Sequence, residues 1–336
     1  MPKSIPAQLK FALKKTRDML AEKKDYAEAR RQLVSIPSAE NYPQFHAAMA
    51  RIALLEGDSG LSLAHGEKAL SLNPDDVRML IRVGKMRLAS NDIEGARQCA
   101  NRALAVGTSE KNQTMVLATL FQQIEEPETS LRLLSSVEDK NPNDSRLHRM
   151  IASAHLRMNQ LDEAEKGLRD CLRISPSNHA ALVMLGEIEM NKENYDKTVQ
   201  SLQSADNEQC PAKLQTRLIL DLAEAFVMLA RLAEAKNILA RIEDTSSPRY
   251  NYLWGVIQLK EGTNELALKS MKAAAVALRN RRDNDGAVDP LSNLTGDILE
   301  DAECLQEEVG KALKRFQWSR GNQSEASDGP DIDEFI

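Results

Sequence analysis

Few residues in this chain have a type and spacing that could do chemistry. His148 and His155 lie seven residues apart on one face of a predicted helix, so together they could in principle meet a metal ion. No acidic or thiol side chain stands between them at i+3 or i+4 to complete such a site. We therefore interpret both as core histidines that contribute to packing, and we expect no bound metal and no cofactor.

The other reactive side chains form no catalytic pattern. The four cysteines are far apart and include no CxxC pair, which excludes a zinc ribbon and a dithiol redox motif; they are Cys99, Cys171, Cys210 and Cys304. We expect Cys99 and Cys171 to be buried thiols, and acidic pairs such as Glu125 and Glu126 to be solvated surface. The sequence has no nucleophile elbow, P-loop, HExxH or dinucleotide-binding glycine motif. It therefore predicts a protein that is not an enzyme.

Charge and hydropathy argue against two further classes of partner. The chain has 44 Lys+Arg and 50 Asp+Glu, for a net charge of -6, and an acidic chain is poorly suited to non-specific binding of nucleic acid phosphates. No apolar run reaches the roughly 18 residues of a membrane span, so we expect no membrane insertion. The basic first residues lack the apolar core of a secretory signal, so we expect a cytoplasmic location.

The elements that position these residues are predicted to be helices in a repeating array. Aromatic residues make up only 4% of the chain, which is rich in Ala, Leu, Glu, Lys and Arg, and this composition favours helix. Prolines recur in the similar contexts SLNPDD, DKNPND and RISPSN, at Pro74, Pro142 and Pro176. The last two define a 34-residue period, and the first lies two such periods before the second. This period places successive units at Pro43, Val77, Lys111, Ser145 and His179. Two further units start near Thr216 and Pro248, and a degenerate first unit spans roughly Lys10 to Asn41.

Three positions of each unit hold small residues, which let two antiparallel helices approach closely. Position 8 holds Ala50, Gly84, Ala118, Ala152 and Gly186. Position 20 holds Ser62, Ala96, Ser130, Ala164 and Thr198, and position 27 holds Ala69, Ala103, Val137, Cys171 and Ala205. A single helix pair cannot bury its apolar face alone, so we expect neighbouring pairs to stack on one another.

With this period and these small positions, the units resemble tetratricopeptide repeats over residues 10–281. The resemblance implies an all-α fold, a right-handed α-solenoid of about eight helix-turn-helix repeats, preceded by a lead-in of residues 1–9. Positions 4 and 11 depart from the family, where Trp and Tyr are usual. Position 4 holds His46, Leu80, Thr114, His148 and Leu182 here.

A different pattern follows the repeats. We interpret residues 281–289 as a linker and residues 290–318 as an amphipathic helix that caps the last repeat. Residues 319–336 are polar and acidic, and we predict that they form a disordered tail. The tail ends in a possible acidic and apolar motif: Asp331, Asp333, Glu334, Phe335 and Ile336.

The resemblance also implies where partners bind. In this family, positions 2, 5, 9, 12 and 13 of each first helix line the concave groove. In the seven units after the first, those positions hold only two acidic residues, Glu187 and Glu224, and nine basic ones: Arg51, Arg78, Lys85, Arg146, Arg149, Arg157, Arg217, Arg249 and Lys260. Apolar residues accompany them, namely Leu54, Leu55, Ile81, Leu88, Met115, Val183, Met190, Leu220, Met228 and Tyr252. We predict a groove that binds a protein or peptide segment carrying acidic and apolar residues, because Arg matches carboxylates and Met adapts to apolar ligands.

Several functions remain open at this point. The first is a non-enzymatic adaptor that assembles a complex through its groove, and the second is a regulatory or targeting subunit of an enzyme or of a secretion and envelope-assembly complex. A chaperone cofactor with a carboxylate clamp is the third, but position 5 holds Ala47, Ile81, Met115 and Arg149, which does not match that clamp. Self-association and docking of the acidic tail into its own groove also remain open.

Overall fold

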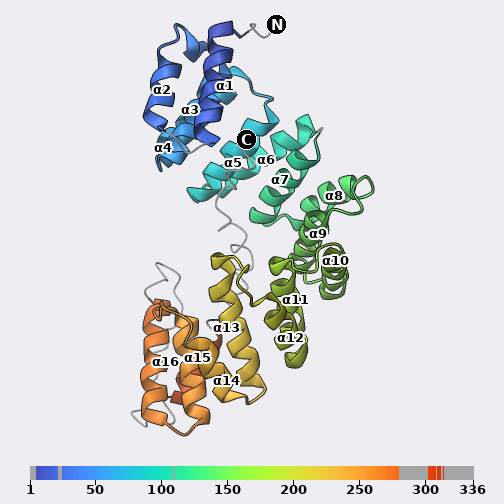
Figure 1. The fold of residues 1–336 in the computed structure, drawn as a ribbon, viewed down its shortest axis with the longest axis vertical. Coiled ribbons are helices and arrows are strands. Elements are labelled where there is room, and N and C mark those ends of the chain that lie inside the picture. The colour runs from blue at the N-terminus through green and yellow to red at the C-terminus, as the bar shows by residue number, and fades with distance from the viewer. Residues whose placement is uncertain are drawn as a thin grey trace. The chain divides into compact units, whose positions relative to one another are not determined.

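A computed structural model describes residues 5–21, 25–108, 110–279, 302–307, 309–311 and 313. Within these residues the regular elements are sixteen α-helices numbered α1 to α16, one short 3-10 helix and a helical C-terminal segment within residues 302–313, with no strand (Figure 1). The linker and the acidic tail, including Asp331 to Ile336, lie outside the described residues.

The helices alternate between the first and the second member of a pair. The first helices are α1 (Ala7–Ala21), α3 (Pro43–Leu55), α5 (Val77–Ala89), α7 (Lys111–Gln123), α9 (Ser145–Arg157), α11 (His179–Asn191), α13 (Ala212–Met228) and α15 (Pro248–Lys260). The second helices are α2 (Tyr26–Val34), α4 (Ser59–Leu72), α6 (Ile93–Val106), α8 (Pro127–Glu138), α10 (Leu161–Ile174), α12 (Tyr195–Ala205), α14 (Leu232–Leu239) and α16 (Asn264–Arg279). The 3-10 helix η1 (Ala39–Asn41) precedes α3.

The helix starts follow the repeat, with two differences from the expected ones. From α3 to α11 the first helices begin at the residues that the period predicts. Helix α1 begins at Ala7, three residues before the expected Lys10, and α13 begins at Ala212, four before the expected Thr216. Pro211 directly precedes α13 and sets this earlier start, because its fixed φ suits a helix N-terminus.

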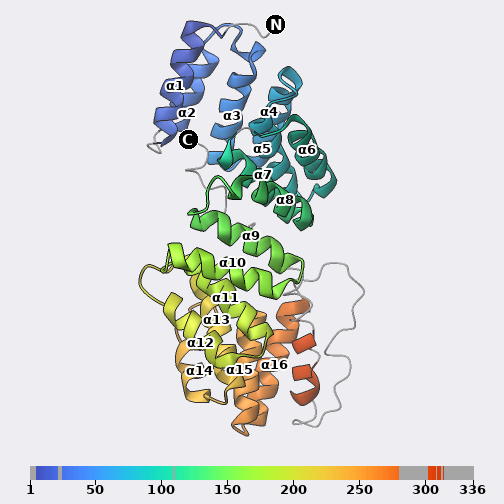
Figure 2. The ribbon, with the colours of Figure 1, turned by 90° about the vertical axis from the view of Figure 1, so that its right-hand side faces the viewer.

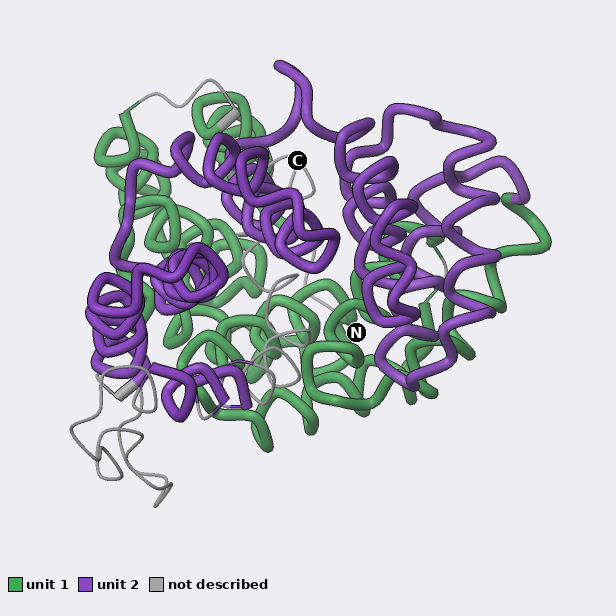
Figure 3. The backbone as a smooth tube through the Cα atoms, turned by 90° about the horizontal axis from the view of Figure 1, so that it is seen from below, with its two compact units in different colours: residues 1–141, 324–336 green, residues 142–323 purple. Residues whose placement is uncertain are grey.

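The chain divides into two compact units (Figure 3). Unit 1 contains helices α1 to α8 and ends at Asn141, and unit 2 begins at Pro142 and contains helices α9 to α16. Figure 2 shows the helix pairs of each unit following one another, for example α9 with α10 in unit 2.

The seven pairs from α3 and α4 onward each turn at a residue in the left-handed backbone conformation. Seven such residues follow the first helices α3 to α15: Gly57, Asn91, Glu125, Asn159, Glu193, Ala230 and Gly262, with φ between 57° and 83°. The next residue donates its N–H to a carbonyl five positions back, for example Asp92 to Arg87 at 2.8 Å. This closure satisfies carbonyls that the helix end leaves without partners. Glycine and, to a lesser degree, asparagine tolerate this conformation, so the three turns at Glu125, Glu193 and Ala230 carry local strain.

Small residues at positions 8 and 20 bring the paired helices together. A Cβ at Gly186 of α11 would lie 2.7 Å from the Leu202 side chain of α12, so any larger residue would require Leu202 to move. In α4 the buried Ser62 hydroxyl donates to the Ala50 carbonyl of α3 at 2.8 Å. The close approach expected from the small residues is therefore present.

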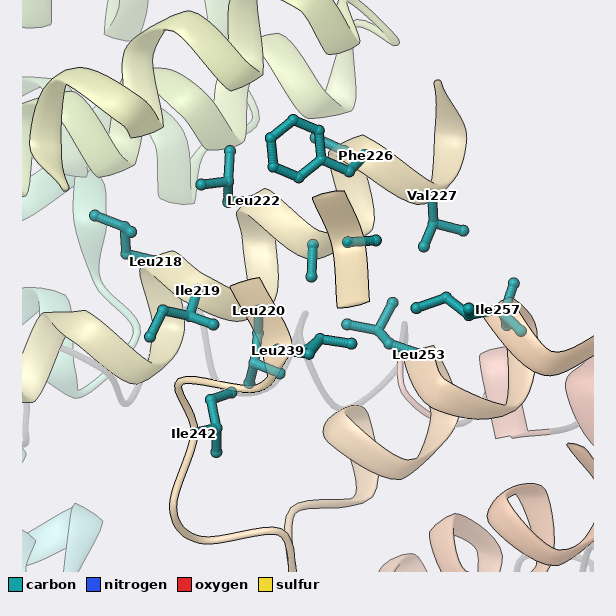
Figure 4. Packing of buried hydrophobic residues seen from close by; sticks show 14 of the residues in the cluster. Leu218, Ile219, Leu220, Leu222, Phe226, Val227, Leu239, Ile242, Leu253 and Ile257 are labelled. Atoms are coloured by element: carbon teal, nitrogen blue, oxygen red, sulfur yellow. The ribbon is translucent and has the colours of Figure 1, made fainter. Parts of the chain in front are cut away.

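The largest apolar cluster of unit 2 runs from α11 to α16 (Figure 4). It includes Leu218, Leu222 and Phe226 of α13 and Leu253 and Ile257 of α15. Leu305, Val309 and Leu313, from within the predicted capping helix, are buried in the same cluster. The described part of that segment is helical and covers the last pair, α15 and α16.

Candidate partner-binding surface

Polar side chains at position 4 hold the loop that leads into a first helix. The His46 and His148 rings each donate from Nε2 to a carbonyl six residues upstream, Glu40 at 3.0 Å and Pro142 at 2.8 Å. Asn251 Nδ2 makes the same bond to the Thr245 carbonyl at 2.9 Å. Thr114 Oγ1 reaches Thr108 Oγ1, again six residues upstream, at 2.7 Å. These side chains anchor the inter-repeat loop at the position where the family usually has tryptophan.

The two histidines considered for a metal site therefore have structural partners. His155 Nδ1 donates to Gln160 Oε1 at 2.7 Å, while His148 bonds the Pro142 carbonyl. Both rings are half-buried rather than fully buried in the core. No group of three or more His, Cys, Asp or Glu suited to a metal ion occurs in the described residues.

The cysteines of the repeats also pack as structural side chains. Cys99, Cys171 and Cys210 are buried, and burial raises the pKa of all three thiols. A raised pKa keeps a thiol protonated and poorly nucleophilic at neutral pH.

In unit 1 the predicted groove cations lie on α3 and α5. Arg51 and Lys85 are half-buried. Arg78 is exposed and donates from Nη2 to both carboxylate oxygens of Glu110, at 2.9 and 3.0 Å. One predicted groove cation of this unit is therefore engaged in a surface ion pair.

Two further arginines, which the sequence analysis missed, join this group. Arg17 of α1 precedes Arg51 by one repeat period, and Lys85 follows Arg51 by the same interval, so all three hold equivalent places on successive first helices. Arg82 lies on the same face of α5 as Lys85, at i, i+3. We call Arg17, Arg51, Arg82 and Lys85 the cationic row.

Like charges act on one another within the cationic row. The pKa of Arg82 is lowered to about 10, mainly by burial and then by the guanidinium group of Arg51; Asp76 raises it and Arg78 lowers it, both by less. Burial also lowers the pKa of Arg51, and the positive charge of Arg17 lowers it further. An anion placed here would relieve both the lost solvation and the repulsion.

In unit 2 the predicted groove cations on α13 and α15 form an ion-pair ladder: Glu187, Arg217, Asp221, Arg249 and Glu224. Arg217 of α13 pairs with Glu187 of α11, and its Nε lies 3.9 Å from Asp221 Oδ2. Arg249 of α15 lies 2.5 Å from both Asp221 and Glu224 of α13. The ladder thus joins three successive first helices.

The ion pairs of the ladder neutralise charges that are largely buried. The Arg249 and Asp221 side chains are only 17% and 10% exposed. Burial lowers the pKa of Arg249, but the Asp221 and Glu224 carboxylates outweigh it and raise that pKa above its ordinary value. Asp221 occupies position 6, which the groove assignment did not include, so the sequence count overestimated the positive charge of this surface.

The remaining predicted residues of unit 2 are spread over α9 and α15. On α9, Arg146 is exposed, and Arg149 and Arg157 are half-buried. Lys260 is the exposed last residue of α15. Tyr252 is half-buried, and its Oη lies 3.0 Å from the place of a Cβ on Gly310, so it packs against the C-terminal segment.

Several apolar residues expected in the groove belong to the core instead. Ile81, Met115, Val183 and Leu220 are buried. They lie at position 5, which faces the neighbouring helices in these repeats. Leu54, Leu55, Leu88 and Met190 are half-buried, and Met228 is 53% exposed.

The repeating helix pairs are similar to those of known proteins. A family model described as tetratricopeptide repeat matches residues 149–212. A tetratricopeptide repeat protein from Parabacteroides merdae aligns over 79% of this chain and 98% of its own, with a TM-score of 0.57 and 15% identity. The chain contains tetratricopeptide repeats at residues 149–212, and its repeating helix pairs have the fold of tetratricopeptide-repeat proteins.

Two other solved structures share this tetratricopeptide-repeat fold. PilW, described as a type IV pilus biogenesis factor, covers 59% of this chain and 91% of its own, with a TM-score of 0.52 and 14% identity. The Cut9–Hcn1 complex, a hetero-tetramer of the APC/C, covers 84% of this chain and 58% of its own, with a TM-score of 0.56 and 14% identity. No curated protein matches the tetratricopeptide-repeat chain. Among its described helices, none combines the length and the apolar character that a membrane crossing requires.

Proposed function

We propose that this tetratricopeptide-repeat protein is a non-enzymatic scaffold, which binds an acidic segment of a partner protein on the surface of its first helices. The cationic row is the observation that carries this proposal. It brings positive groups from α1, α3 and α5 together, and its half-buried guanidinium groups suit carboxylate ligands. Stacked helix pairs offer an extended surface for such a segment.

The reactive side chains support a non-catalytic role. His148 holds a loop and His155 holds a turn, and the buried thiols have raised pKa values. Half-buried Leu54, Leu55 and Leu88 on α3 and α5 would contact the apolar residues of the segment. We also propose a cytoplasmic location.

Affinity purification from the native host, followed by reconstitution with the purified partner, tests the proposal. We expect a direct complex that is lost when Arg51 and Lys85 are both changed to Glu. The control changes two exposed cations of the second helix α16, Lys269→Glu and Lys272→Glu, and should leave the complex intact. A partner that binds both variants equally would contradict binding on the first helices.

The identity of the partner separates the two main roles. Recovery of a catalytic chain whose activity changes on binding would favour a regulatory subunit of an enzyme. Recovery of several non-catalytic proteins in one complex would favour an adaptor.

A further inference from the structure

One position of the second helices alternates between charged and apolar residues. It is position 21, which directly follows the small residue of position 20. In α2, α14 and α16 that small residue is Ala29, Ala235 and Ala267. From α2 to α16, position 21 holds Arg30, Leu63, Arg97, Leu131, Glu165, Val199, Lys236 and Leu268. Every second helix pair along the chain therefore carries a charge at this position.

Each charged residue at position 21 pairs with the turn that follows the next first helix. The pairs are Arg30 with Glu56 after α3, Arg97 with Glu126 after α7, Glu165 with Lys192 after α11, and Lys236 with Glu261 after α15. All eight side chains are between 12% and 38% exposed. A charge at this depth that lost its partner would keep little of its solvation, which is unfavourable.

The pair between α10 and α11 has the opposite polarity to the other three. Here the second helix supplies the carboxylate, Glu165, which lies 2.6 Å from Lys192 Nζ. Asp162 lies 2.6 Å from the same nitrogen, and Arg169 pairs with Glu165 one helical turn later. Helix α10 therefore fits a cationic turn and would meet like charge at the acidic turns after α3, α7 and α15.

The junctions between α4 and α5 and between α12 and α13 use apolar residues at position 21. Leu63 packs against the cluster that α4 shares with α5, and Val199 is buried in the cluster that α12 shares with α13. The residues that cap the following first helices are Ser90 after α5 and Leu229 after α13, and both are uncharged. These two caps offer no counter-charge to a charged residue at position 21.

We propose that position 21 and the following turn form a pairing code, which decides which helix pair stacks on which. The pairs share the same small residues, so their shape alone would let one pair stack on a wrong neighbour, in the same chain or in a second copy. A shift by one pair would place charged residues on apolar junctions, and a shift by two pairs would bring like charges together at α10 and α11. Such mismatches disfavour the wrong partners more than they stabilise the right one.

The first test uses the full chain and the Lys236–Glu261 pair, which has no third ionic member among the described residues. Lys236→Glu and Glu261→Lys each place like charges together, and the double variant restores a pair with the polarity found at α10 and α11. In urea denaturation we expect each single variant to lower the folded-to-unfolded ratio about fivefold, and the double variant to return within about twofold of the wild type.

The matched control is the Asp170–Arg173 pair, which lies within helix α10 and crosses no junction. Asp170→Arg, Arg173→Asp and their combination should each stay within about twofold of the wild type, as exposed pairs of this kind do. A swap at Lys236 and Glu261 that recovers nothing, or a recovery equally large in the control pair, would overturn the code.

The second test converts an apolar junction into an ionic one. Val199→Lys places a charge at position 21 of α12, and adding Leu229→Glu supplies a counter-charge on the turn after α13. We expect the double variant to be more stable than Val199→Lys alone. No gain in stability from Leu229→Glu would contradict the code at this junction.

Refolding separates a pairing code from ordinary stabilising contacts. After dilution from urea, light scattering should show species heavier than the wild type for the mismatched single variants, because their helix pairs stack between copies. The double variant at Lys236 and Glu261 should refold to the wild-type mass. Single variants that lose stability but keep the wild-type mass would show that the pairs do not select neighbours, and the inference would be wrong.

Discussion

At the scale of single residues, two serines at the same repeat position have opposite surroundings. The Ser130 hydroxyl is buried without a hydrogen bond, whereas Ser62 donates to the Ala50 carbonyl at 2.8 Å. A buried polar group without a partner costs about 1–3 kcal/mol, and a satisfied one contributes about 1 kcal/mol. We expect Ser130→Ala to raise the free energy of unfolding by about 1 kcal/mol and Ser62→Ala to lower it by a similar amount.

Urea denaturation followed by circular dichroism measures both serine variants. Alanine already occupies this position as Ala96 and Ala164, so the substitution fits the helix pair. A destabilised Ser130→Ala variant would show that this hydroxyl has a role in packing.

His46 and His65 form a partly buried pair that makes unit 1 sensitive to pH. Their Nδ1 atoms are 3.0 Å apart, and the His46 Nε2–H bond to Glu40 leaves Nδ1 of His46 as the acceptor for His65. Burial lowers the pKa of both rings, and the neighbouring cations Lys68 and Arg30 add to this effect on His46 and His65, respectively.

The direction of the pH effect follows from these shifts. Unfolded histidines take up protons near pH 6.5, whereas the folded pair does so only at lower pH. The unfolded state therefore binds more protons as the pH falls through 6.5, and folding stability falls with it. We expect a lower urea midpoint at pH 5.5 than at pH 7.5, and a smaller difference in a His65→Leu variant. Equal differences in both proteins would rule out the pair as the cause.

Only part of the candidate site could be predicted from the sequence. Arg51 and Lys85 follow from family positions, but Arg17 was missed because the groove positions were read only in the seven units that follow the degenerate first one. Asp221 was missed because it lies outside the family's groove positions, although its i, i+4 spacing from Arg217 is a signal for an ion pair. Burial of Ile81 and Met115 depends on the packing of neighbouring helices, which spacing alone does not give.

At the scale of elements, the left-handed turns give a prediction about local strain. Ala230 is exposed and has a φ of 58°. The left-handed conformation costs alanine about 1–2 kcal/mol, and replacement by glycine removes this cost. Glycine also makes the unfolded chain more flexible, which offsets about 0.4–1 kcal/mol of the stabilisation. We expect Ala230→Gly to raise the free energy of unfolding by about 0.5–1 kcal/mol.

The matched control for this turn is Ala273→Gly on the exposed side of α16. A helical glycine costs about 1 kcal/mol, so the same substitution should destabilise the protein there. If both variants shift the urea midpoint in the same direction, backbone conformation is not the cause.

At the scale of the whole molecule, the C-terminal segment protects the end of unit 2. Leu305 and Val309 are fully buried against α15 and α16. Changing both to Asp would bury two charges or expose the cluster, at a cost of several kcal/mol. We expect a lower melting temperature and new binding of a hydrophobic dye.

Glu307→Gln provides the control for the capping segment. Glu307 is exposed and lies 2.6 Å from Lys311, and such surface pairs contribute about 0–1 kcal/mol. Wild-type stability in the Leu305 and Val309 variant would mean that the segment does not cap unit 2.

The all-helical architecture could be predicted because the same small residues, which helix packing requires, recur at the same positions of successive units. Close approach at Gly186 and the turns at Asn91 and Asn159 are examples that the pattern anticipates. The division after Asn141 could not be predicted, since the period continues through it without a change in register.

The hydrogen bonds from position 4 also constrain how such an array can be rearranged. Each ties a first helix to a carbonyl or hydroxyl that precedes that helix by a few residues, as His148 does with Pro142 and Asn251 with Thr245. Gene duplication or protein engineering that cuts the chain between these two residues would separate donor from acceptor. Modules exchanged at the tight turn inside a helix pair would keep the two together, so that turn is the natural crossover point for building longer or shorter versions.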